Sequence, residues 1–395
     1  MHPNWLLPEF VDDVLPQEAQ NVERVRRRVL DLFASCGYEL VSPPLIEYIE
    51  SLLTGSAKDL DLQTFKLVDQ ISGKTLGIRA DITPQIARID AHLLRGEGVS
   101  RLCYADRVLR TQPEQGGMSR ELVQLGAELF GCSEIVADIE INRLMVQSVR
   151  EVVGSPLTLD LGTVAIAQAV SNWLNLSEES KVQYYRGLQL KDSDMLEDFS
   201  REFNDDARAV VMALPKMYGD YTVIERGRDV LASVPGAKQR LDELDMVYNA
   251  VKEYVSHVSF DLAELRGFEY HSGLVAAVYV EGQTSPIARG GRYDHVGQTF
   301  GKARPATGFT LDLRRLAQCS SVNGAANSVK KVWAPSSDND AKLLSKISSL
   351  RQSGDVVIED LSGGTQNLIG SQYTHKLVKN ASEWSLVDID RSIDR

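Results

Sequence analysis

The stretch from Arg101 to Gly131 constrains the fold most, because it has the pattern of two strands joined by a polar loop. In its second arm aliphatic residues take every other position, and Gln124, Gly126 and Glu128 lie between them. Successive side chains of a strand point to opposite faces, so Gln124 and Glu128 share the face opposite the aliphatic residues. That face is either the solvent-facing side of an antiparallel sheet or a place where a small polar molecule lies across the glycine.

Length and composition indicate a globular protein of several domains. The 395 residues leave room for two or three domains, and 43% hydrophobic and 25% charged residues are ordinary values. No apolar run approaches the roughly 20 residues of a membrane helix, and the N-terminus is acidic and interrupted by prolines. We therefore expect a cytoplasmic protein without a membrane segment. The net charge of −12, without a basic tract, argues weakly against nucleic-acid binding.

The four cysteines do not form a metal-ligand pattern. They are scattered, without a CxxC pair or histidines at metal-site spacing, and are Cys36, Cys103, Cys132 and Cys319. Packing as free thiols is their default role, so we expect no metal, no disulfide framework and no cofactor.

Periodicity predicts the elements that precede the central stretch. Apolar residues at helical spacing indicate a helix from Ala19 to Cys36, and two prolines make the following Tyr38 to Ile46 an edge strand. Short apolar runs at Thr64 to Asp69 and Thr75 to Arg79 are typical of a hairpin. The next helix should begin with Thr83 as its N-cap, because a proline occupies the following position.

Several motifs resemble those of one enzyme family. The second signature motif of class II aminoacyl-tRNA synthetases, in its histidyl-tRNA synthetase form, is matched without gaps by Arg110, Arg120, Gln124 and Glu128. RGFEYH at 266–271 and SPIARGGRYD at 285–294 are similar to the two signatures of the histidine-specific branch. ATGFTLDLRRL at 306–316 resembles the third class II motif.

The resemblance implies an α+β fold, a class II aminoacyl-tRNA synthetase-like antiparallel sheet flanked by helices. Residues 1–176 and 255–318 would form this core domain, and the charged segment 177–254 would be the helical insertion of histidyl-tRNA synthetases. Residues 319–395 would form a short α/β domain similar to a truncated anticodon-binding domain. Because this domain lacks a basic face, we expect no tRNA partner.

A histidine-binding pocket follows from the same resemblance. Its candidate residues are Asp81, Thr83, Arg110, Gln124, Glu128, Arg266, Tyr270 and His271. Asp81 and Gln124, beside Thr83, would hold the ammonium group of the ligand. Asp81 stands where the family has a glutamate, which keeps the charge on a side chain one methylene shorter.

The remaining candidates would surround the other two groups of the ligand. Arg110 and Arg266 would hold the carboxylate. Glu128, together with Tyr270 or His271, would contact the imidazole ring. His271 departs from the family, which commonly has a tyrosine there.

The end of the pocket that would hold ATP departs more strongly from the family. Gln112 and Pro113 replace a glutamate and an arginine that serve the adenine and the phosphates, and Asp312 and Arg314 replace a glycine and an acid. Proline offers no guanidinium, and a carboxylate repels a polyphosphate. We therefore expect a site that binds an amino acid and is catalytically silent.

An intact amino-acid end beside a degraded nucleotide end is similar to the synthetase-like regulatory subunits of short-form ATP phosphoribosyltransferase. This resemblance implies a non-catalytic subunit, hetero-oligomeric with the short catalytic subunit, that is required for the first step of histidine biosynthesis. L-histidine would be its feedback effector. It also implies a dimer, built through the strand that contains Pro44. The loop from Gln112 to Ser119, expected to be mobile, and the helical insertion are candidates for transmitting the signal.

Three alternatives stay open at the level of sequence. The first is an active histidyl-tRNA synthetase, against which Pro113 and Asp312 argue. The second is a ligase that uses histidine and ATP on another acceptor, and the same residues argue against it. The third is an architectural subunit that activates its partner while histidine binds elsewhere.

Overall fold

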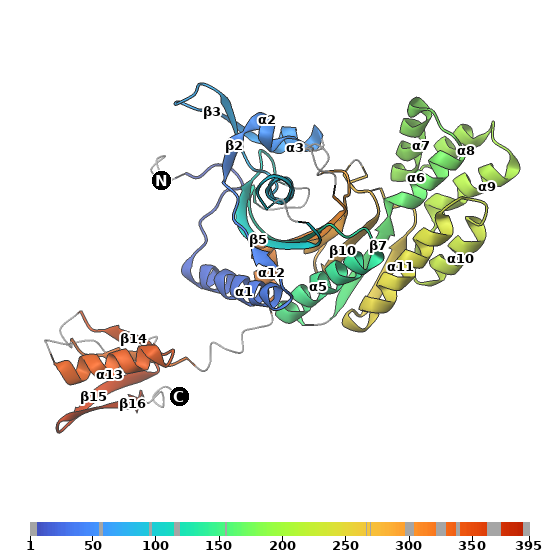
Figure 1. Cartoon of the computed structure of the whole chain (residues 1–395). Helices are drawn as coiled ribbons and strands as arrows, with labels where there is room; N and C mark the ends of the chain where they lie inside the picture. The colour runs from blue at the N-terminus through green and yellow to red at the C-terminus, as the bar shows by residue number, and fades with distance from the viewer. Residues whose placement is uncertain are drawn as a thin grey trace. The chain divides into compact units, whose positions relative to one another are not determined.

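A large mixed sheet forms the centre of the first of two compact units, Met1–Ser320 and Ser321–Arg395 (Figure 1). The computed structural model describes residues 6–54, 58–94, 97–113, 119–154, 156–265, 267–268, 270–296, 304–320, 329–336, 340–361 and 373–389. Within them the sheet has nine strands, in the order β1-β5-β6-β12-β11-β10-β7-β9-β8. In that order their bounds are Glu39–Leu40, Ser100–Leu109, Glu121–Phe130, Ala306–Asp312, Ala288–Arg292, Leu274–Val280, Leu157–Thr163, His257–Asp261 and Tyr218–Gly219.

Strand pairing is antiparallel from β5 through β7. It is parallel where β1 joins β5 and where β9 joins β7. The predicted α+β fold is confirmed, although the sheet is mixed and not purely antiparallel. The hairpin of β5 and β6 forms in one continuous register, from Ser100 opposite Phe130 to Leu109 opposite Glu121. Of its loop, 114–118 lie outside the described residues.

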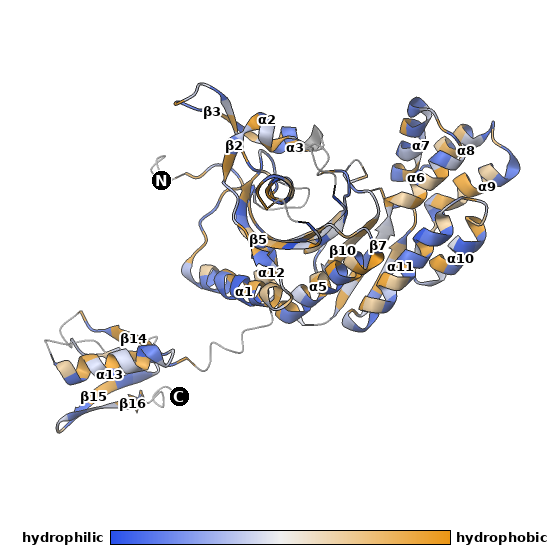
Figure 2. Ribbon diagram, in the orientation of Figure 1, coloured by the Kyte–Doolittle hydropathy of each residue, from blue (hydrophilic) through white to orange (hydrophobic). Residues whose placement is uncertain are grey.

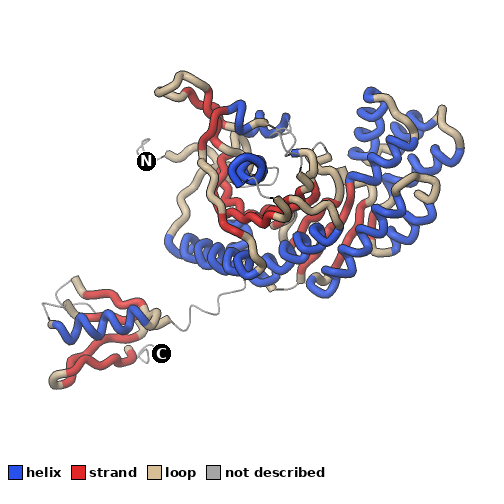
Figure 3. The backbone as a smooth tube through the Cα atoms, viewed as in Figure 1, coloured by secondary structure: helices blue, strands red, loops and turns tan. Residues whose placement is uncertain are grey.

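Helices cover both faces of the central strands (Figure 3). On one face α1 (Pro16–Ser35), α5 (Ile135–Val153) and α12 (Leu313–Gln318) pack on aliphatic residues such as Leu125, Ala127 and Leu129. On the other face α4 (Thr83–Arg88) and the π-helix η2 (Ile89–Leu94) pack against Tyr104 and its neighbours. The sheet is therefore buried on both sides, and polar residues of its second face need partners inside the protein.

A small antiparallel sheet leads the chain to that second face. Its order is β2-β4-β3, with bounds Ile46–Tyr48, Thr75–Ile78 and Phe65–Val68, and α2 (Ile49–Leu52) and α3 (Lys58–Gln63) follow β2. The predicted hairpin of β3 and β4 is confirmed. After β4 the Arg79 carbonyl accepts from the Leu109 amide at 3.0 Å, and the Arg79 guanidinium donates to the carbonyls of Pro43 and Arg107. These bonds fix the segment that carries Asp81.

Helices dominate the chain between β7 and β9. They are α6 (Val164–Trp173), α7 (Glu178–Leu190), α8 (Ser193–Ser200), α9 (Asp205–Ala213), η3 (Leu214–Lys216), α10 (Thr222–Val230), α11 (Ala237–Val251) and η4 (Lys252–Tyr254). Each longer helix carries hydrophobic and hydrophilic residues (Figure 2), as expected for a helix with one buried face. The short strand β8, which composition did not indicate, pairs with β9 and extends the large sheet.

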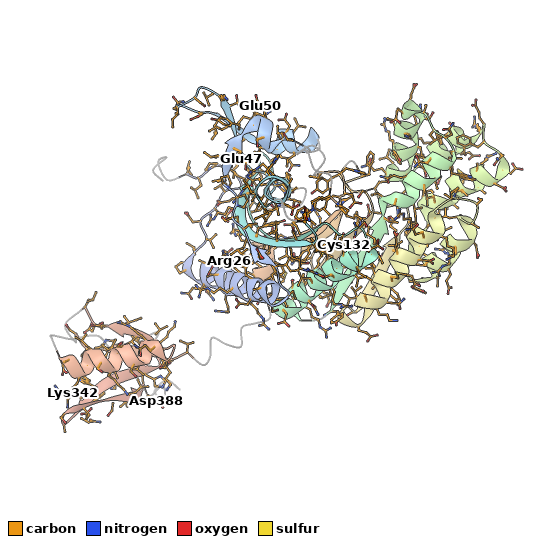
Figure 4. All side chains as sticks on the ribbon, viewed as in Figure 1. Arg26, Glu47, Glu50, Cys132, Lys342 and Asp388 are labelled. Atoms are coloured by element: carbon orange, nitrogen blue, oxygen red, sulfur yellow. The ribbon has the colours of Figure 1, made fainter. Side chains whose placement is uncertain are left out.

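The second unit has a four-stranded sheet with one helix in its described residues. The strand order is β14-β13-β15-β16, with bounds Val356–Glu359, Lys331–Ala334, His375–Asn380 and Glu383–Asp388, and the helix is α13 (Ala341–Gln352). Lys342 donates to Glu383 at 3.0 Å, and Asp388 lies 2.7 Å from His375; both Lys342 and Asp388 are labelled in Figure 4. Among the helices of the described chain, none is long and apolar enough to span a membrane.

A buried ion pair ties α5 to β11. The Arg292 guanidinium donates to Oδ2 of Asp138 through Nη2 and Nε, at 2.5 and 3.0 Å, and its Nε lies 3.2 Å from Oδ1. Asp138 is only 2% exposed. Arg292 also donates to Asp294 at 3.1 Å and to two backbone carbonyls. A charge this deeply buried is costly once its partner is removed.

We predict that Asp138→Ala lowers the free energy of unfolding by about 3 kcal/mol, because it leaves the Arg292 guanidinium buried with less compensation. Urea unfolding of the full chain, followed by far-UV circular dichroism, measures the change. The control Glu23→Ala removes the exposed partner of Arg27 and should cost less than about 1 kcal/mol. Equal losses in the two variants would contradict a specific role for the buried pair.

Candidate functional site

A cavity of about 330 Å³ lies over the second face of the large sheet. Seven of the eight predicted residues line it, namely Asp81, Thr83, Arg110, Gln124, Glu128, Tyr270 and His271. The eighth, Arg266, lies outside the described residues. Five parts of the chain therefore meet here: α3, the start of α4 with the turn before it, the β5–β6 hairpin, the segment before β10, and the paired strands β11 and β12.

The floor of the cavity follows from strand register. Glu128 of β6 lies opposite Gly308 of β12, and Gly308 lies opposite Gly291 of β11. A Cβ atom at Gly308 would overlap the Glu128 carboxylate, and one at Gly291 would crowd the His271 ring. The two glycines thus let a carboxylate and an imidazole lie directly on the backbone of the sheet.

Glu128 is the centre of a hydroxyl network. Its Oε1 accepts from the Thr83 hydroxyl at 3.1 Å and from the Tyr104 hydroxyl at 3.2 Å, while its Oε2 accepts from the Tyr293 hydroxyl. Only 1% of Glu128 and 4% of Gln124 is exposed, so the solvent-facing interpretation of this strand is wrong. Burial outweighs the three hydroxyl donors and raises the pKa of Glu128 to about 8.

The gap over Gly126 is filled by the protein itself, not by a ligand. Tyr104 lies directly opposite Gly126 in the register, and a Cβ atom at Gly126 would overlap the Tyr104 hydroxyl. The cavity is lined by Gln124 and Glu128, on either side of Gly126 along β6, and by Thr310 of β12, which lies opposite Gly126.

Asp81 and Gln124 are held by the backbone at the start of α4. The Gln124 Oε1 accepts from the Ile82 amide at 3.0 Å, which leaves its NH₂ group and one lone pair available. The Asp81 Oδ1 accepts from the Thr83 amide at 3.0 Å. Thr83 is not an N-cap, since Ile82 occupies that position without a side-chain bond and the Thr83 hydroxyl binds Glu128 instead.

Tyr270 and His271 form a second wall. Tyr270 stacks on Tyr293 with ring centroids 5.1 Å apart, and its buried hydroxyl has no hydrogen-bond partner among the described residues. The His271 Nδ1 lies 3.3 Å from the Arg292 carbonyl, so it carries the proton and leaves Nε2 as an acceptor. Burial lowers the pKa of His271 to about 4, which keeps the ring neutral near pH 7. An orphan hydroxyl beside a neutral imidazole is suited to a polar ring of a ligand.

Two arginines also line the cavity. They are Arg110, whose Nε donates to the Ala80 carbonyl at 3.3 Å, and Arg289 of β11. Both arginines also line an adjoining cavity of about 70 Å³. The sequence did not point to Arg289 as a site residue, because the resemblance of SPIARGGRYD to the histidine-branch signature rests on the glycines and the residues that follow them.

Tyr104 and Tyr293 were also missed as site residues. Tyr104 has the alternation of an ordinary strand residue, and only its register opposite Gly126 reveals its contact with Glu128. Tyr293 lies within SPIARGGRYD, so the motif offered a signal that was not used.

Near the adjoining cavity, the residues that depart from the synthetase motifs contact other parts of the protein. Asp312 caps α12 by accepting from the Arg315 amide at 3.2 Å, and burial raises its pKa. Arg315 donates to the carbonyls of Ser285 and Pro286. Arg314 pairs with Asp12 and Glu18 at 2.9 and 3.0 Å. These side chains are committed to structural contacts.

Metal chemistry has no candidate site in the part of the chain that the structure describes. No group of three or more histidine, cysteine, aspartate or glutamate side chains there could hold an ion. The cysteines are free, with Cys36 exposed and Cys103 buried.

The raised pKa of Glu128 predicts a pH-dependent stability. The folded chain holds this proton up to about pH 8, whereas the unfolded chain releases it near 4.5, so the free energy of unfolding should fall as pH rises between those values. The slope from this group is at most about 1.4 kcal/mol per pH unit. Urea unfolding from pH 5 to pH 8 measures it. Glu128→Gln should remove this part of the slope, and parallel profiles for parent and variant would contradict the assignment.

Comparison with known proteins identifies the family of this chain. The sequence profile described as histidyl-tRNA synthetase matches residues 10–316, and the profile described as ATP phosphoribosyltransferase subunit HisZ C-terminal domain matches residues 329–387. The ATP phosphoribosyltransferase regulatory subunit of Cupriavidus metallidurans is 45% identical over 98% of this chain and 100% of its own length. That of Ralstonia pickettii is 44% identical over 100% of both chains.

Solved structures show the same fold. A protein from Bacillus halodurans, described as an ATP phosphoribosyltransferase regulatory subunit/histidyl-tRNA synthetase, has a TM-score of 0.78 and 26% identity and covers 92% of this chain and 94% of its own. The histidyl-tRNA synthetase of Nostoc, at 19% identity and TM-score 0.76 over 98% and 95%, supports the fold alone. Identity of about 45% over the full length shows that this chain belongs to the family of ATP phosphoribosyltransferase regulatory subunits.

Proposed function

We propose that this chain senses L-histidine in the 330 Å³ cavity and transmits its presence to a separate, short catalytic subunit of ATP phosphoribosyltransferase. That enzyme joins ATP to phosphoribosyl pyrophosphate in the first step of histidine biosynthesis, so the end product would control its own pathway. The observation that carries the proposal is the polarity of the cavity. Its lining combines the carboxyl groups of Asp81 and Glu128 with the guanidinium groups of Arg110 and Arg289, and Tyr270 and His271 form one wall.

This polarity matches an amino acid with a polar ring. The ammonium group would bind Asp81 and the free lone pair of the Gln124 oxygen, and the carboxylate would bind Arg110. The imidazole would lie against Glu128 and the orphan Tyr270 hydroxyl, which a purely apolar side chain would leave unpaired. A cavity of this size, near the lower end of the range for ligand pockets, suits a small molecule.

The expected affinity is that of a metabolite sensor. Each charge-assisted hydrogen bond contributes ~1.5 to 3 kcal/mol, and association costs at least ~4 kcal/mol. A dissociation constant between micromolar and millimolar follows. Feedback then requires a coupling free energy of only about 1 to 3 kcal/mol between this cavity and the partner's active site.

We further propose that the chain itself is not catalytic. Formation of an aminoacyl adenylate needs basic side chains free to neutralise the phosphates of ATP. Arg314 and Arg315 are bound to carboxylates and carbonyls, and the Asp312 carboxylate lines the adjoining cavity, where it would repel the phosphates of a nucleotide. These contacts favour regulation over the rival function, tRNA charging.

Assembly is proposed as a dimer that joins the short catalytic subunit in a hetero-oligomer. Ile46, Tyr48 and Leu67 share one face of the small sheet by register and are 41 to 46% exposed. Pro44 itself lies in no strand, because the predicted edge strand Tyr38 to Ile46 is divided into β1 and β2 on either side of the two prolines. An apolar face of this kind, next to Pro44, supports self-association there. The helical segment 177–254 and the loop at 112–119, partly outside the described residues, remain candidates for signal transmission.

Calorimetry with the full chain tests the sensing function. L-histidine should bind the parent once per chain, and Glu128→Ala should weaken binding at least tenfold, because it removes the centre of the hydroxyl network. Glu121→Ala is the matched control, since Glu121 lies on the same strand but points to the opposite face, and it should bind like the parent. No heat in the parent, or equal affinities in the parent and Glu128→Ala, would contradict the proposal.

Reconstitution with the short catalytic subunit supplies the second readout. Histidine should inhibit phosphoribosyl transfer by the mixture, and Glu128→Ala should raise the inhibitory concentration in proportion to the lost affinity. Purified chain should show no histidine-dependent exchange between ATP and pyrophosphate. Such exchange would instead establish a charging enzyme.

A further inference from the structure

We infer that Gln63 is a further ligand-binding residue of the cavity, and that its carboxamide hydrogen-bonds the bound amino acid and so makes α3 part of the ligand-bound site. The inference rests on the proposed function, because it concerns the same cavity. Neither the periodicity of the chain nor its resemblance to the synthetase motifs gave Gln63 a role.

The short helix α3 places Gln63 on the cavity. Leu60 and Gln63 both line it, whereas Leu62, between them, is 75% exposed. Residues three apart lie on the same side of a helix, so α3 turns Leu60 and Gln63 toward the cavity and Leu62 toward solvent. Gln63 is only partly buried, which leaves its side chain accessible to a molecule that enters the cavity.

The backbone around Gln63 is held by the end of β5. The Gln63 carbonyl accepts from the Thr111 amide at 2.9 Å, and the Leu62 carbonyl accepts from the Thr111 hydroxyl at 2.7 Å. The next residue, Thr64, forms a β-bridge with Arg110. These contacts fix the Cα atom of Gln63 beside the cavity, and none of them uses its carboxamide.

The carboxamide of Gln63 makes no hydrogen bond in the part of the chain that the structure describes. The other polar side chains Asp81, Gln124 and Glu128 of the lining each already accept a hydrogen bond from the protein. A carboxamide carries two N–H donors and an oxygen with two lone pairs, so it can bond to the charged groups or to the polar ring of an amino acid. Its whole hydrogen-bonding capacity remains for the ligand.

A ligand that contacts Gln63 connects α3 to the large sheet, because Glu128 of β6 lines the same cavity. Without a ligand, the bonds to Thr111 hold only the C-terminal end of α3 to β5. Binding should therefore suppress local opening of α3, and slower exchange of its backbone amide hydrogens reports this change.

Hydrogen exchange and calorimetry on the full chain test the inference. In the parent, saturating L-histidine should slow exchange in peptides that cover residues 58–64 and in peptides that cover Asp81 and Thr83. Gln63→Met keeps the helix propensity and approximate length of the side chain but removes the carboxamide. It should weaken L-histidine about 3- to 10-fold. At saturating ligand it should lose most of the protection of residues 58–64 and keep that of Asp81 and Thr83.

Gln70→Met is the matched control. Gln70 lies in the turn between β3 and β4, is exposed, and is not among the residues that line the cavity. The same chemical change there should leave both the affinity and the protection of residues 58–64 as in the parent. Equal losses in the two variants would reduce the effect to a general disturbance of the small sheet and overturn the inference.

The remaining outcomes separate this inference from the function on which it rests. If the parent binds L-histidine and Gln63→Met keeps either the parental affinity or the full protection of residues 58–64, the inference is wrong and the sensing function stands. If the parent does not bind L-histidine, the sensing function fails, and the role of Gln63 fails with it.

Discussion

The contact between the Glu128 carboxylate and the glycine of β12 is the constraint on which the site depends. A carboxylate can lie on the backbone of a central strand only where the facing residue is Gly308, and it can stay there only with donors around it. Thr83, Tyr104 and Tyr293 supply these donors from three different elements. The buried Glu128 thereby joins α4, β5 and the residue that follows β11.

The two ends of the cleft differ in how their side chains are used. At the amino-acid end, Glu128 is surrounded by donors, and the Tyr270 hydroxyl is left without a partner among the described residues. At the other end, Asp312 and Arg314 hold together α12, the N-terminal segment and α1. We interpret this contrast as retention of ligand recognition together with conversion of the nucleotide end into structural contacts. Regulation needs only the recognition of the ligand.

Sequence reasoning was reliable where one physical rule acts alone. Strand alternation placed Gln124 and Glu128 on one face and identified the β5–β6 hairpin, because the pleat has a fixed period. It failed where a contact joins residues that are distant in the sequence. Thr83 was expected to cap a helix, but its hydroxyl binds Glu128. Gly126 was expected to leave open space, but Tyr104 fills it. β15, with only Leu377 and Val378 apolar, had too weak a pattern to be noticed.

We propose that the cleft holds an amino acid and excludes a nucleotide. A crystal structure of the full chain, grown with excess L-histidine, ATP and magnesium, tests both halves at once. We expect histidine with its ring against Glu128 and its carboxylate toward Arg110, and no nucleotide beside Asp312. ATP bound in a bent conformation next to Gln112 and Asp312 would contradict it and identify a charging enzyme instead.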